Sequence, residues 1–534
     1  MDVAVGILGG LGLFLYGMNL MGEGLQKSAG DRLKKIVELL TSNIIIGVLV
    51  GTVVTAIIQS SSATTVMIVG FVNAGKMSLT QAIGVIMGAN IGTTVTAQLV
   101  SFNLEGIAPI SIGIGIILYL FSSKAQVKNI AEILLGFGIL FTGMEFMKDA
   151  VKPLAEYKGF TDALVSFGHR PILGLLLGFG ITAVVQSSSA SMGMLIALAA
   201  QGLIPLDSAL PILYGQNIGT CVTSLISSIG ANRNAKRSAV MHLSFNIIGT
   251  MVFLILLNRP IVALVTRLNP NDVARQIANT HTLFNVISVL ILLPFAKYLV
   301  KLAIKLVPDN NDEDNKFTLY IDERMLETPS IAVGNTVKEV LRMGEIAKEC
   351  LEKSINGFLK KSDGDIKSTF KLEKKINELQ KDLLNYLLML SKTHLPDDLR
   401  EEVDNLFNII NDIERIGDHA ENIAELASEF SSQSASMSDE GISEITKMYK
   451  KVLQNYENAL KVIETRDQAI ANKVIIDEEE VDKMEKSIRV NHINRLNSNL
   501  CSIDAGIVYL DLISNLERIS DHCENISKKF ISNE

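Results

Sequence analysis

Two polar segments of the chain are copies of one another and lie inside long apolar stretches. Residues 51–101 align with residues 178–228 at a constant offset of 127 without a gap, and 20 of the 51 positions are identical. The preceding stretch is repeated too, because residues 17–21 (GMNLM) resemble residues 143–147 (GMEFM) at an offset of 126. The repeated unit is therefore about 125 residues long, and we expect two equivalent helical bundles in the fold.

The first part of the chain has enough apolar stretches for several membrane-spanning helices, each of which needs roughly 20 residues. The candidate stretches are residues 3–25, 44–72, 79–101, 106–122, 129–147, 171–202, 205–229, 238–258 and 283–304. The two repeated segments contain many Gly, Ser, Thr, Asn and Gln residues, for which lipid offers no partners. The sequence therefore predicts an all-α, polytopic membrane domain built from two repeats with broken or re-entrant helices.

The charge of the chain changes sign near residue 305. Residues 1–305 contain 20 Lys and Arg and 12 Asp and Glu, a net of +8, whereas the remainder contains 29 and 45, a net of −16. An acidic soluble domain argues against nucleic acid as a partner, since phosphates require a basic surface. We expect a transmembrane domain at 1–305 with repeats at about 1–125 and 126–305, a linker at 306–335 and a soluble helical domain at 336–534.

The centre of each repeated segment is a Gln followed by three Ser, which places one amide and three hydroxyls on a single turn. In a dry site these groups need partners. Sodium binds hydroxyl, amide and carbonyl oxygens, whereas an oxyanion binds hydroxyl and N–H donors and the positive end of a helix. The repeated segments contain no basic residue except Lys76 and no carboxylate except Asp207. Bound Na⁺ could therefore supply the charge that neutralises an anion, although small hydroxyl residues also pack membrane helices closely.

The segments Gln59-Ser-Ser-Ser-Ala-Thr64 and Gln186-Ser-Ser-Ser-Ala-Ser191 resemble those of the type II sodium–phosphate cotransporter family, over roughly residues 1–305. In that family the two segments face each other from inverted repeats and form the phosphate and sodium sites, and the resemblance implies the same arrangement here. With the repeated Asn-Ile-Gly-Thr segments included, the candidate substrate- and sodium-binding residues are Gln59, Ser60, Ser61, Ser62, Thr64, Asn90, Thr93, Gln186, Ser187, Ser188, Ser189, Ser191, Asn217 and Thr220. Met192 replaces Thr65 in the second copy, so which copy serves phosphate and which Na⁺ stays open.

A shorter pattern, H-x-x-F-N, occurs twice after the second polar segment. One copy runs from His242 to Asn246 and the other from His281 to Asn285. Histidines on an apolar face are usually satisfied by hydrogen bonds in the core, and contact with substrate or protons is the alternative. Both interpretations stay open at the level of sequence.

The C-terminal part of the chain shows apolar residues at spacings of three and four, which predicts long amphipathic helices. They are expected near residues 335–361, 365–392, 397–430, 439–466, 468–494 and 500–531. This part is also duplicated, because residues 413–423 match residues 516–526 at an offset of 103. We therefore expect two units of three helices each.

Each copy of this second repeat carries a Glu and an Asp four residues apart, on one face of a helix. Oxygen ligands at such positions suit Mg, Mn or Fe. The segments resemble PhoU, the phosphate-signalling regulator, whose ExxxD motifs can hold metal clusters. The resemblance implies a divalent or iron-type metal with the ligands Glu414, Asp418, Glu517 and Asp521. A solvated acidic face, paired locally with Arg415 and Arg518, is the alternative.

Taken together, these resemblances imply a multi-pass transporter of the bacterial inner membrane that moves inorganic phosphate with Na⁺ by alternating access. The transporter would be followed by a cytoplasmic, regulatory PhoU-like domain. Because PhoU-like helices often self-associate, the resemblance is also compatible with a homodimer. The chain has no nucleophile–base constellation and no GxxxxGK[ST] segment, so we expect neither an enzyme nor ATP-driven transport. Three alternatives stay open: a phosphate exporter, a transporter of another oxyanion, and a membrane-anchored signalling protein.

Overall fold

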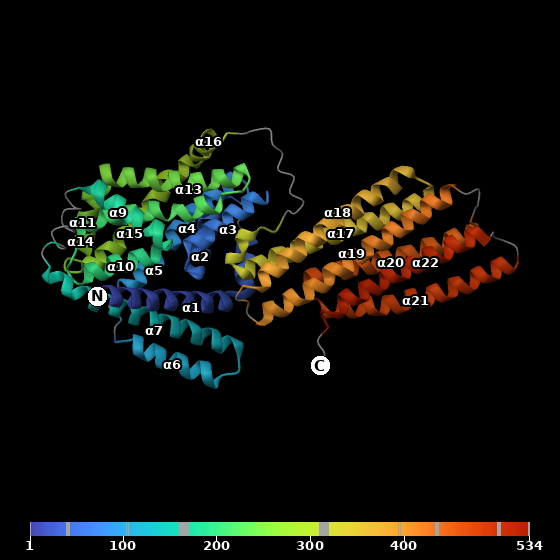
Figure 1. The fold of residues 1–534 in the computed structure, drawn as a ribbon, viewed down its shortest axis with the longest axis horizontal. Helices are drawn as coiled ribbons and strands as arrows, with labels where there is room; N and C mark the ends of the chain where they lie inside the picture. Colours follow the sequence, from blue (N-terminus) through green and yellow to red (C-terminus); the bar gives the residue numbers. More distant parts are fainter. Residues whose placement is uncertain are drawn as a thin grey trace. The chain divides into compact units, whose positions relative to one another are not determined.

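The computed structural model divides the chain into two compact units, and the elements of its described residues are helical (Figure 1). The structure describes residues 2–38, 43–102, 104, 106–157, 159, 170–308, 320–393, 395, 397–432, 437–498 and 503–531. The membrane unit comprises Met1–Asp314 and Asp322–Thr328, and the bundle unit comprises Asn315–Ile321 and Pro329–Glu534. The predicted all-helical fold is confirmed.

Among the described residues, five helices of the membrane unit are long and apolar enough to cross a membrane. They are Val3–Ala29, Leu79–Val100, Ala125–Leu154, Arg233–Leu268 and Val273–Leu306. Several other apolar stretches of the sequence form pairs of shorter helices instead. The stretch at 44–72, for example, contains α2 (Ile44–Ile58) and most of α3 (Ser61–Asn73), which agrees with the predicted broken helices.

The duplication in the sequence is reproduced helix by helix. The first repeat consists of α2 (Ile44–Ile58), α3 (Ser61–Asn73), α4 (Leu79–Gly92) and α5 (Thr94–Val100). The second repeat consists of α9 (Pro171–Val185), α10 (Ser188–Ala200), α11 (Leu206–Gly219) and α12 (Cys221–Ser227). Each boundary in the second repeat lies 127 residues after its counterpart in the first, so the same local signals act twice.

The break before α3 and the break before α10 have the same backbone geometry. Gln59 and Gln186 end the preceding helices in the left-handed conformation, with φ angles of 59° and 54°. Ser60 and Ser187 follow in extended conformation, and each side chain accepts a hydrogen bond from a backbone N–H in the first turn of the next helix. A left-handed residue stops a helix and a serine N-cap starts the next, which explains why Gln-Ser-Ser-Ser breaks an apolar run.

Glycines of the repeated Gly-x-Asn-Ile-Gly-Thr segments allow α2 to pack against α4, and α9 against α11. A Cβ atom at Gly88 would lie 2.1 Å from the carbonyl oxygen of Val48, and one at Gly215 would lie 2.0 Å from that of Leu175. Any larger residue would collide with the neighbouring backbone. The close backbone approach at these glycines therefore occurs between helices of one repeat.

The helices that precede the two repeats, α1 (Asp2–Glu38) and α7 (Ala125–Val151), pack against each other in opposite directions. A Cβ atom at Gly10 would approach Gly143, and one at Gly17 would approach Gly136, so residue numbers rise along α1 as they fall along α7. Gly10 and Gly17 correspond to Gly136 and Gly143 in the repeated sequence. These two equivalent helices, α1 and α7, are therefore antiparallel.

Helix α6 (Ala108–Phe121) packs on α7. Further helical elements of the membrane unit follow α12 in the chain. They are α13 (Arg233–Val252), a π-helical turn at Phe253–Leu257, α14 (Asn258–Leu268), α15 (Val273–Leu292), a 3₁₀ turn at Leu293–Phe295 and α16 (Ala296–Leu306). Tyr214, Phe253 and Phe284 form a buried aromatic cluster that joins α11, the π turn and α15. This cluster holds α15 against the second repeat.

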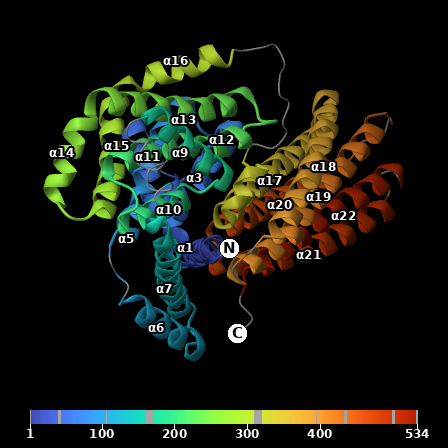
Figure 2. The same cartoon turned by 60° about the vertical axis from the view of Figure 1, so that its left-hand side comes forward.

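The bundle unit contains six long helices, which Figure 2 shows from a second direction. They are α17 (Pro329–Lys360), α18 (Asp363–Ser391), α19 (Asp397–Ser432), α20 (Asp439–Thr465), α21 (Gln468–Asn497) and α22 (Ile503–Lys528). Helices α17, α18 and α19 pack together, as do α20, α21 and α22. Helix α17 begins within the stretch expected to be linker, and a 3₁₀ turn at Glu323–Glu327 precedes it.

Candidate functional site

The first polar motif is closed by hydrogen bonds from its own repeat. The side chain of Gln59 is only 5% exposed. Thr96 on α5 donates to Gln59 Oε1 at 2.8 Å, and the amide nitrogen of Gln59 donates to the carbonyl oxygen of Ala56. One predicted site residue is thus held by a threonine that lies beyond the repeated Asn-Ile-Gly-Thr segment.

The N-terminal turn of α3 leaves one serine hydroxyl without a partner. Ser60 accepts from the backbone N–H of Ala63 at 3.1 Å, and Thr64 donates to the carbonyl oxygen of Ser60 at 3.0 Å. Thr55 on α2 donates to the hydroxyl of Thr64 at 3.0 Å. Ser61 Oγ is buried and has no hydrogen-bond partner among the described residues. A buried hydroxyl in this state is costly unless a ligand or water completes it.

The second polar motif has the same backbone but, among the described residues, lacks the counterparts of three hydrogen bonds of the first motif, namely Thr96 to Gln59, Gln59 to Ala56 and Thr55 to Thr64. Gln186 is exposed, in contrast to Gln59. Thr223 and Thr182, the counterparts of Thr96 and Thr55, have buried hydroxyls without a partner in the described part of the chain. Ser187 still caps α10, and Ser191 still donates to its carbonyl oxygen at 3.0 Å. The threonine hydrogen bonds that hold the first motif are therefore not formed in the second.

Ser62, Ser188 and Ser189 complete the two serine triplets. Ser189 is buried, whereas Ser62 and Ser188 are half-buried. The first motif thus presents Ser61 as its buried serine and the second presents Ser189, so the two motifs differ in which serine is enclosed.

The Asn-Ile-Gly-Thr segments lie at the ends of α4 and α11, where all four predicted polar side chains are buried. These side chains belong to Asn90, Thr93, Asn217 and Thr220. The amide nitrogen of each Asn donates to the backbone carbonyl oxygen one turn earlier, at 2.9 Å. The amide oxygen of each Asn can therefore accept hydrogen bonds from other groups. Gln216, which replaces Ala89, donates to the carbonyl oxygen of Ser191 at 2.9 Å and so ties α11 to α10.

The H-x-x-F-N pattern at His281 contacts the second Asn-Ile-Gly-Thr segment, and the pattern at His242 contacts α12, the helix that follows this segment. His281 Nε2 lies 3.3 Å from Asn217 Oδ1, and the amide nitrogen of Asn285 lies 3.5 Å from the same atom. His242 Nδ1 lies 3.1 Å from Ser224 Oγ, and Asn246 donates to Cys221 Sγ at 3.3 Å. The repeated pattern was visible in the sequence, but its contact with Asn217 was not.

Several buried polar atoms of these residues have no hydrogen-bond partner among the described residues. Within the described chain, His242 Nε2, Asn246 Oδ1, His281 Nδ1 and Asn285 Oδ1 are buried without a hydrogen-bond partner. Such atoms normally bind water or a polar ligand. Sequence reasoning left these four residues undecided. The structure places His281 and Asn285 beside the predicted site residue Asn217, and His242 and Asn246 on α13 against α12.

The two repeats meet through crossed contacts. Helix α3 of the first repeat packs against α12 of the second, and α10 of the second packs against α5 of the first. Each serine-capped helix therefore touches the short helix that follows the Asn-Ile-Gly-Thr segment of the other repeat. In the described residues, no hydrogen bond joins a predicted site residue of one repeat to one of the other.

The four predicted metal ligands lie on α19 and α22, which pack together in the bundle unit. Burial raises the pKa of Glu414 and of Glu517, and the neighbouring Asp of the same motif adds to both shifts. Burial also raises the pKa of Asp521, whereas Asp418 lies 3.4 Å from Arg415. In the part of the chain that the structure describes, no three His, Cys, Asp or Glu side chains converge as a metal site would require. The arrangement does not fit a metal centre, and the metal remains a prediction from resemblance.

Comparison with known proteins identifies both parts of the chain. The family described as Na⁺/Pi-cotransporter matches residues 13–149 and 143–290, and the PhoU domain family matches residues 340–427 and 445–530. The "Putative inorganic phosphate export protein YjbB" of Salmonella typhimurium is 25% identical over 517 residues, which cover 96% of this chain and 95% of that protein.

Two further similarities are more limited. The "Sodium-dependent phosphate transport protein 2A" of Rattus norvegicus is 38% identical over 91 residues, which are 16% of this chain and 14% of that protein. The crystal structure of PhoU from Pseudomonas aeruginosa aligns with 37% of this chain and 94% of that chain, at 19% identity and a TM-score of 0.36. Since the first family match spans residues 13–290 of 534, the chain belongs to the Na⁺/Pi-cotransporter family and carries PhoU domains in its C-terminal part.

Proposed function

We propose that this membrane protein couples the transport of inorganic phosphate to Na⁺ and binds both at the two serine-capped helix breaks. The observation that carries the proposal is the buried, unpartnered hydroxyl of Ser61 at the start of α3, a 13-residue helix. A helix N-terminus with free N–H groups and hydroxyls is a natural site for an oxyanion. Helix α10 starts with the same residues, so each repeat contributes an equivalent half-site.

Coupling to sodium follows from the charge of the motifs. No Arg or Lys lies in either serine-capped break, so a phosphate bound there needs positive charge from elsewhere. The breaks at Gln59 and Gln186 free carbonyl oxygens of the preceding helices, and Asn217, at the end of α11 in the same repeat as Gln186, carries a buried amide oxygen. These neutral oxygens suit Na⁺, and the rat relative is named for sodium dependence.

Alternating access by inverted repeats is supported by two features. Helices α1 and α7 are equivalent in sequence and antiparallel in space, as inversion of the second half requires. The first motif is closed by Thr96 while the second is open, so the two half-sites are in different states within one molecule. A transporter that exchanges these states would expose its site to one side at a time.

Export of phosphate is a second candidate that uses the same site. The relative that aligns with 96% of the chain is named for phosphate export, whereas the rat relative named for sodium dependence covers 16% of it. The direction of net flux depends on the gradients across the membrane, and the PhoU domains would act as the regulator.

The location proposed is the inner membrane of a bacterial cell, with the bundle unit in the cytoplasm. Lys297, Lys301 and Lys305 lie on α16, the last helix before the bundle unit. Basic residues flanking the last membrane helix favour the cytoplasmic side.

The direct test is phosphate flux in proteoliposomes that contain the full chain. We expect flux that depends on a Na⁺ gradient and falls strongly in Ser61→Ala and Ser188→Ala. Ser111→Ala is a matched control, because Ser111 is a buried membrane serine that donates to Leu134 on α7, outside both motifs. Flux without dependence on Na⁺ would overturn the coupling, and unchanged flux in both motif variants would overturn the site. Gradients imposed in either direction separate uptake from export.

A further inference from the structure

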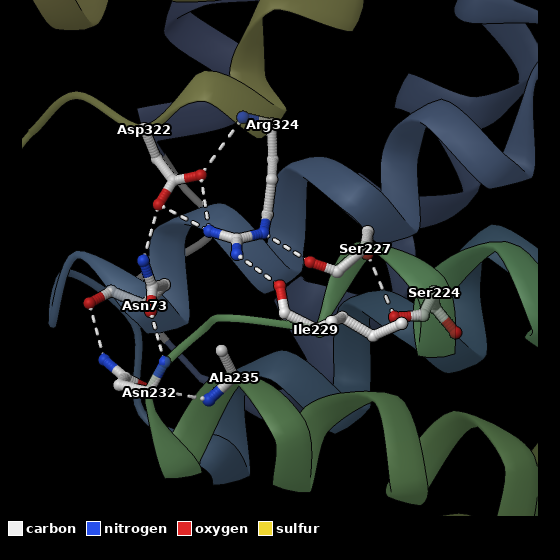
Figure 3. A network of polar contacts seen from close by, with 8 residues as sticks. All are labelled: Asn73, Ser224, Ser227, Ile229, Asn232, Ala235, Asp322 and Arg324. Carbon is white, nitrogen blue, oxygen red and sulfur yellow. Dashed lines mark hydrogen bonds and ion pairs between the residues drawn. The ribbon is translucent and has the colours of Figure 1, made fainter.

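The segment between the membrane helices and the bundle unit is anchored to the end of α3. Asn73, the last residue of α3, donates through its amide nitrogen to a carboxylate oxygen of Asp322 (Figure 3). Asn232, at the start of α13, donates to Asn73 Oδ1 at 2.8 Å and to the Asn73 carbonyl oxygen at 2.6 Å. Asp322 is only 6% exposed, so this is a buried contact of a charged residue. The helix that begins at Ser61 is therefore tied at its other end to Asp322.

The same segment caps α12. Arg324 donates through Nη1 to both carboxylate oxygens of Asp322, at 2.8 Å each. Its Nε donates to the carbonyl oxygen of Ser227, the last residue of α12, and its Nη2 lies 3.4 Å from that of Ile229 (Figure 3). The last carbonyls of a helix lack partners within the helix, so a guanidinium at this position stabilises the helix end.

Apolar packing seats the segment on α3 as well. Met325 is fully buried, and a Cβ atom at Gly70 would lie 3.3 Å from its side chain. Asp322, Arg324 and Met325 together hold the ends of α3 and α12, which come from different repeats and pack against each other. We name residues 322–328 the connector clamp; it belongs to the membrane unit, and α17 begins at the next residue, Pro329.

The equivalent helix in the first repeat is capped by another arginine. Arg275 on α15 donates through Nη1 to the carbonyl oxygen of Gln98 at 3.2 Å and to Ser101 Oγ at 2.7 Å. Its guanidinium carbon lies 3.9 Å from the centre of the Phe102 ring. Gln98 and Ser101 lie at the end of α5, the counterpart of α12. Each short helix that follows an Asn-Ile-Gly-Thr segment is therefore capped by an arginine from outside its repeat.

We propose that Arg275 and Arg324 are paired positioning residues that hold the two ends of the transport path closed, and that the connector clamp lets the PhoU domains control one end only. The proposal rests on the proposed function. If the repeats are inverted, as the antiparallel α1 and α7 support, the ends of α5 and α12 lie at opposite faces of the membrane. The end at Arg324 is joined directly to the bundle unit by the chain, because Pro329 follows the clamp. A change in the bundle unit that pulls on Asp322 would release α3 and α12 together.

The thiol of Cys221 gives a readout that does not depend on phosphate flux. Cys221 is the first residue of α12 and is fully buried. The full chain, in membrane vesicles of both orientations, is treated with an impermeant maleimide, and modification of Cys221 is followed by mass spectrometry. We expect Arg324→Ala to raise the rate of modification about tenfold from the side that carries the bundle unit, a usual size for coupling between sites. Asp322→Asn should raise it less, since the amide keeps an acceptor for Asn73.

Arg275→Ala is the matched control, because it removes the equivalent cap in the first repeat. It should leave modification of Cys221 from the bundle side unchanged. An equal increase from both sides in Arg324→Ala, or no increase in either clamp variant, would overturn the proposal. Arg324→Lys distinguishes a positioning role from a loss of folding. A lysine can donate to one carbonyl oxygen, so we expect a rate of Cys221 modification between those of wild type and Arg324→Ala. The variant should elute like wild type in size-exclusion chromatography. If Cys221 responds as expected but the protein transports no phosphate, the connector clamp proposal is supported and the proposed substrate is wrong.

Discussion

Thr96 donates a hydrogen bond to Gln59 at 2.8 Å, and the equivalent pair, Thr223 and Gln186, does not form it. The four residues occupy matching positions in two repeats whose helix boundaries differ by a constant 127. The same side chains on the same backbone thus adopt two hydrogen-bonding states in one molecule. This difference between identical residues supports a site that is closed in one repeat and open in the other.

Replacement of Thr96 by Val should destabilise the membrane unit. The side-chain oxygen of Gln59 is buried and would lose its donor, at a cost of about 1–3 kcal/mol. Thr223→Val is the matched control, because it removes a buried hydroxyl that has no partner in the described chain, and we expect a neutral or slightly stabilising effect. The measurement is the unfolding temperature of each variant in detergent, compared with that of wild type. Equal loss of stability in the two variants would contradict the asymmetry.

Cysteines at equivalent serines should react at different rates. Ser61 is 4% exposed, whereas Ser188 is half-buried. In the state described here, a water-soluble thiol reagent should modify Ser188→Cys several times faster than Ser61→Cys. Saturating phosphate and Na⁺ should slow both reactions if the two half-sites enclose substrate. Equal rates in the absence of substrate would argue against two different states of the motifs.

Alanine at the motif glycines should prevent normal packing. At Gly88 and Gly215 the added methyl group would lie about 2 Å from a backbone oxygen of the neighbouring helix, and overpacking of this kind costs at least about 1–3 kcal/mol. Gly180→Ala on α9 is the control, since a Cβ atom there meets nothing within 4 Å, and it should gain about 0.5–1 kcal/mol. The yield of folded protein and its unfolding temperature are the measurements. Normal packing of Gly215→Ala would contradict the close approach of α11 to α9.

Ionisation of Glu478 should make the bundle unit less stable as pH rises from about 4.5 to about 7. Burial, with Glu524 and Asp521 nearby, raises the pKa of Glu478 from 4.5 to about 7. Below pH 4.5 the carboxyl is protonated in both folded and unfolded chains; above it the unfolded chain ionises first, so the penalty grows until about pH 7. Glu478→Gln should therefore raise the unfolding temperature of the bundle unit more at pH 8 than at pH 5.

Glu480 provides the opposite case on the same helix. A hydrogen bond from Lys451 lowers the pKa of this carboxyl, so its charged form is favoured in the folded chain. Glu480→Gln should give no gain at pH 8. If both variants gained equally at pH 8, general relief of the negative charge of the bundle would explain the result rather than the burial of Glu478.

The sequence by itself determined the helices and their breaks. The two repeats, broken helices within their polar segments, and the six helices of the bundle unit were predicted, and α17 starts earlier than expected, at Pro329. The exact break points at Gln59 and Gln186 came from the structure. These features are local. A left-handed residue followed by a serine N-cap stops one helix and starts another whatever lies around it, and the 3.6-residue period marks a buried face.

Only the tertiary structure decided which side chains meet. The contact of His281 with Asn217, the different states of Gln59 and Gln186, and the capping of α12 by Arg324 join residues far apart in the chain. Sequence spacing holds no information on such pairs, since they depend on how closely the helices pack and in which direction they run. The glycines at the crossing of α1 with α7 were visible in the sequence, but the antiparallel direction appeared only when those helices were placed side by side.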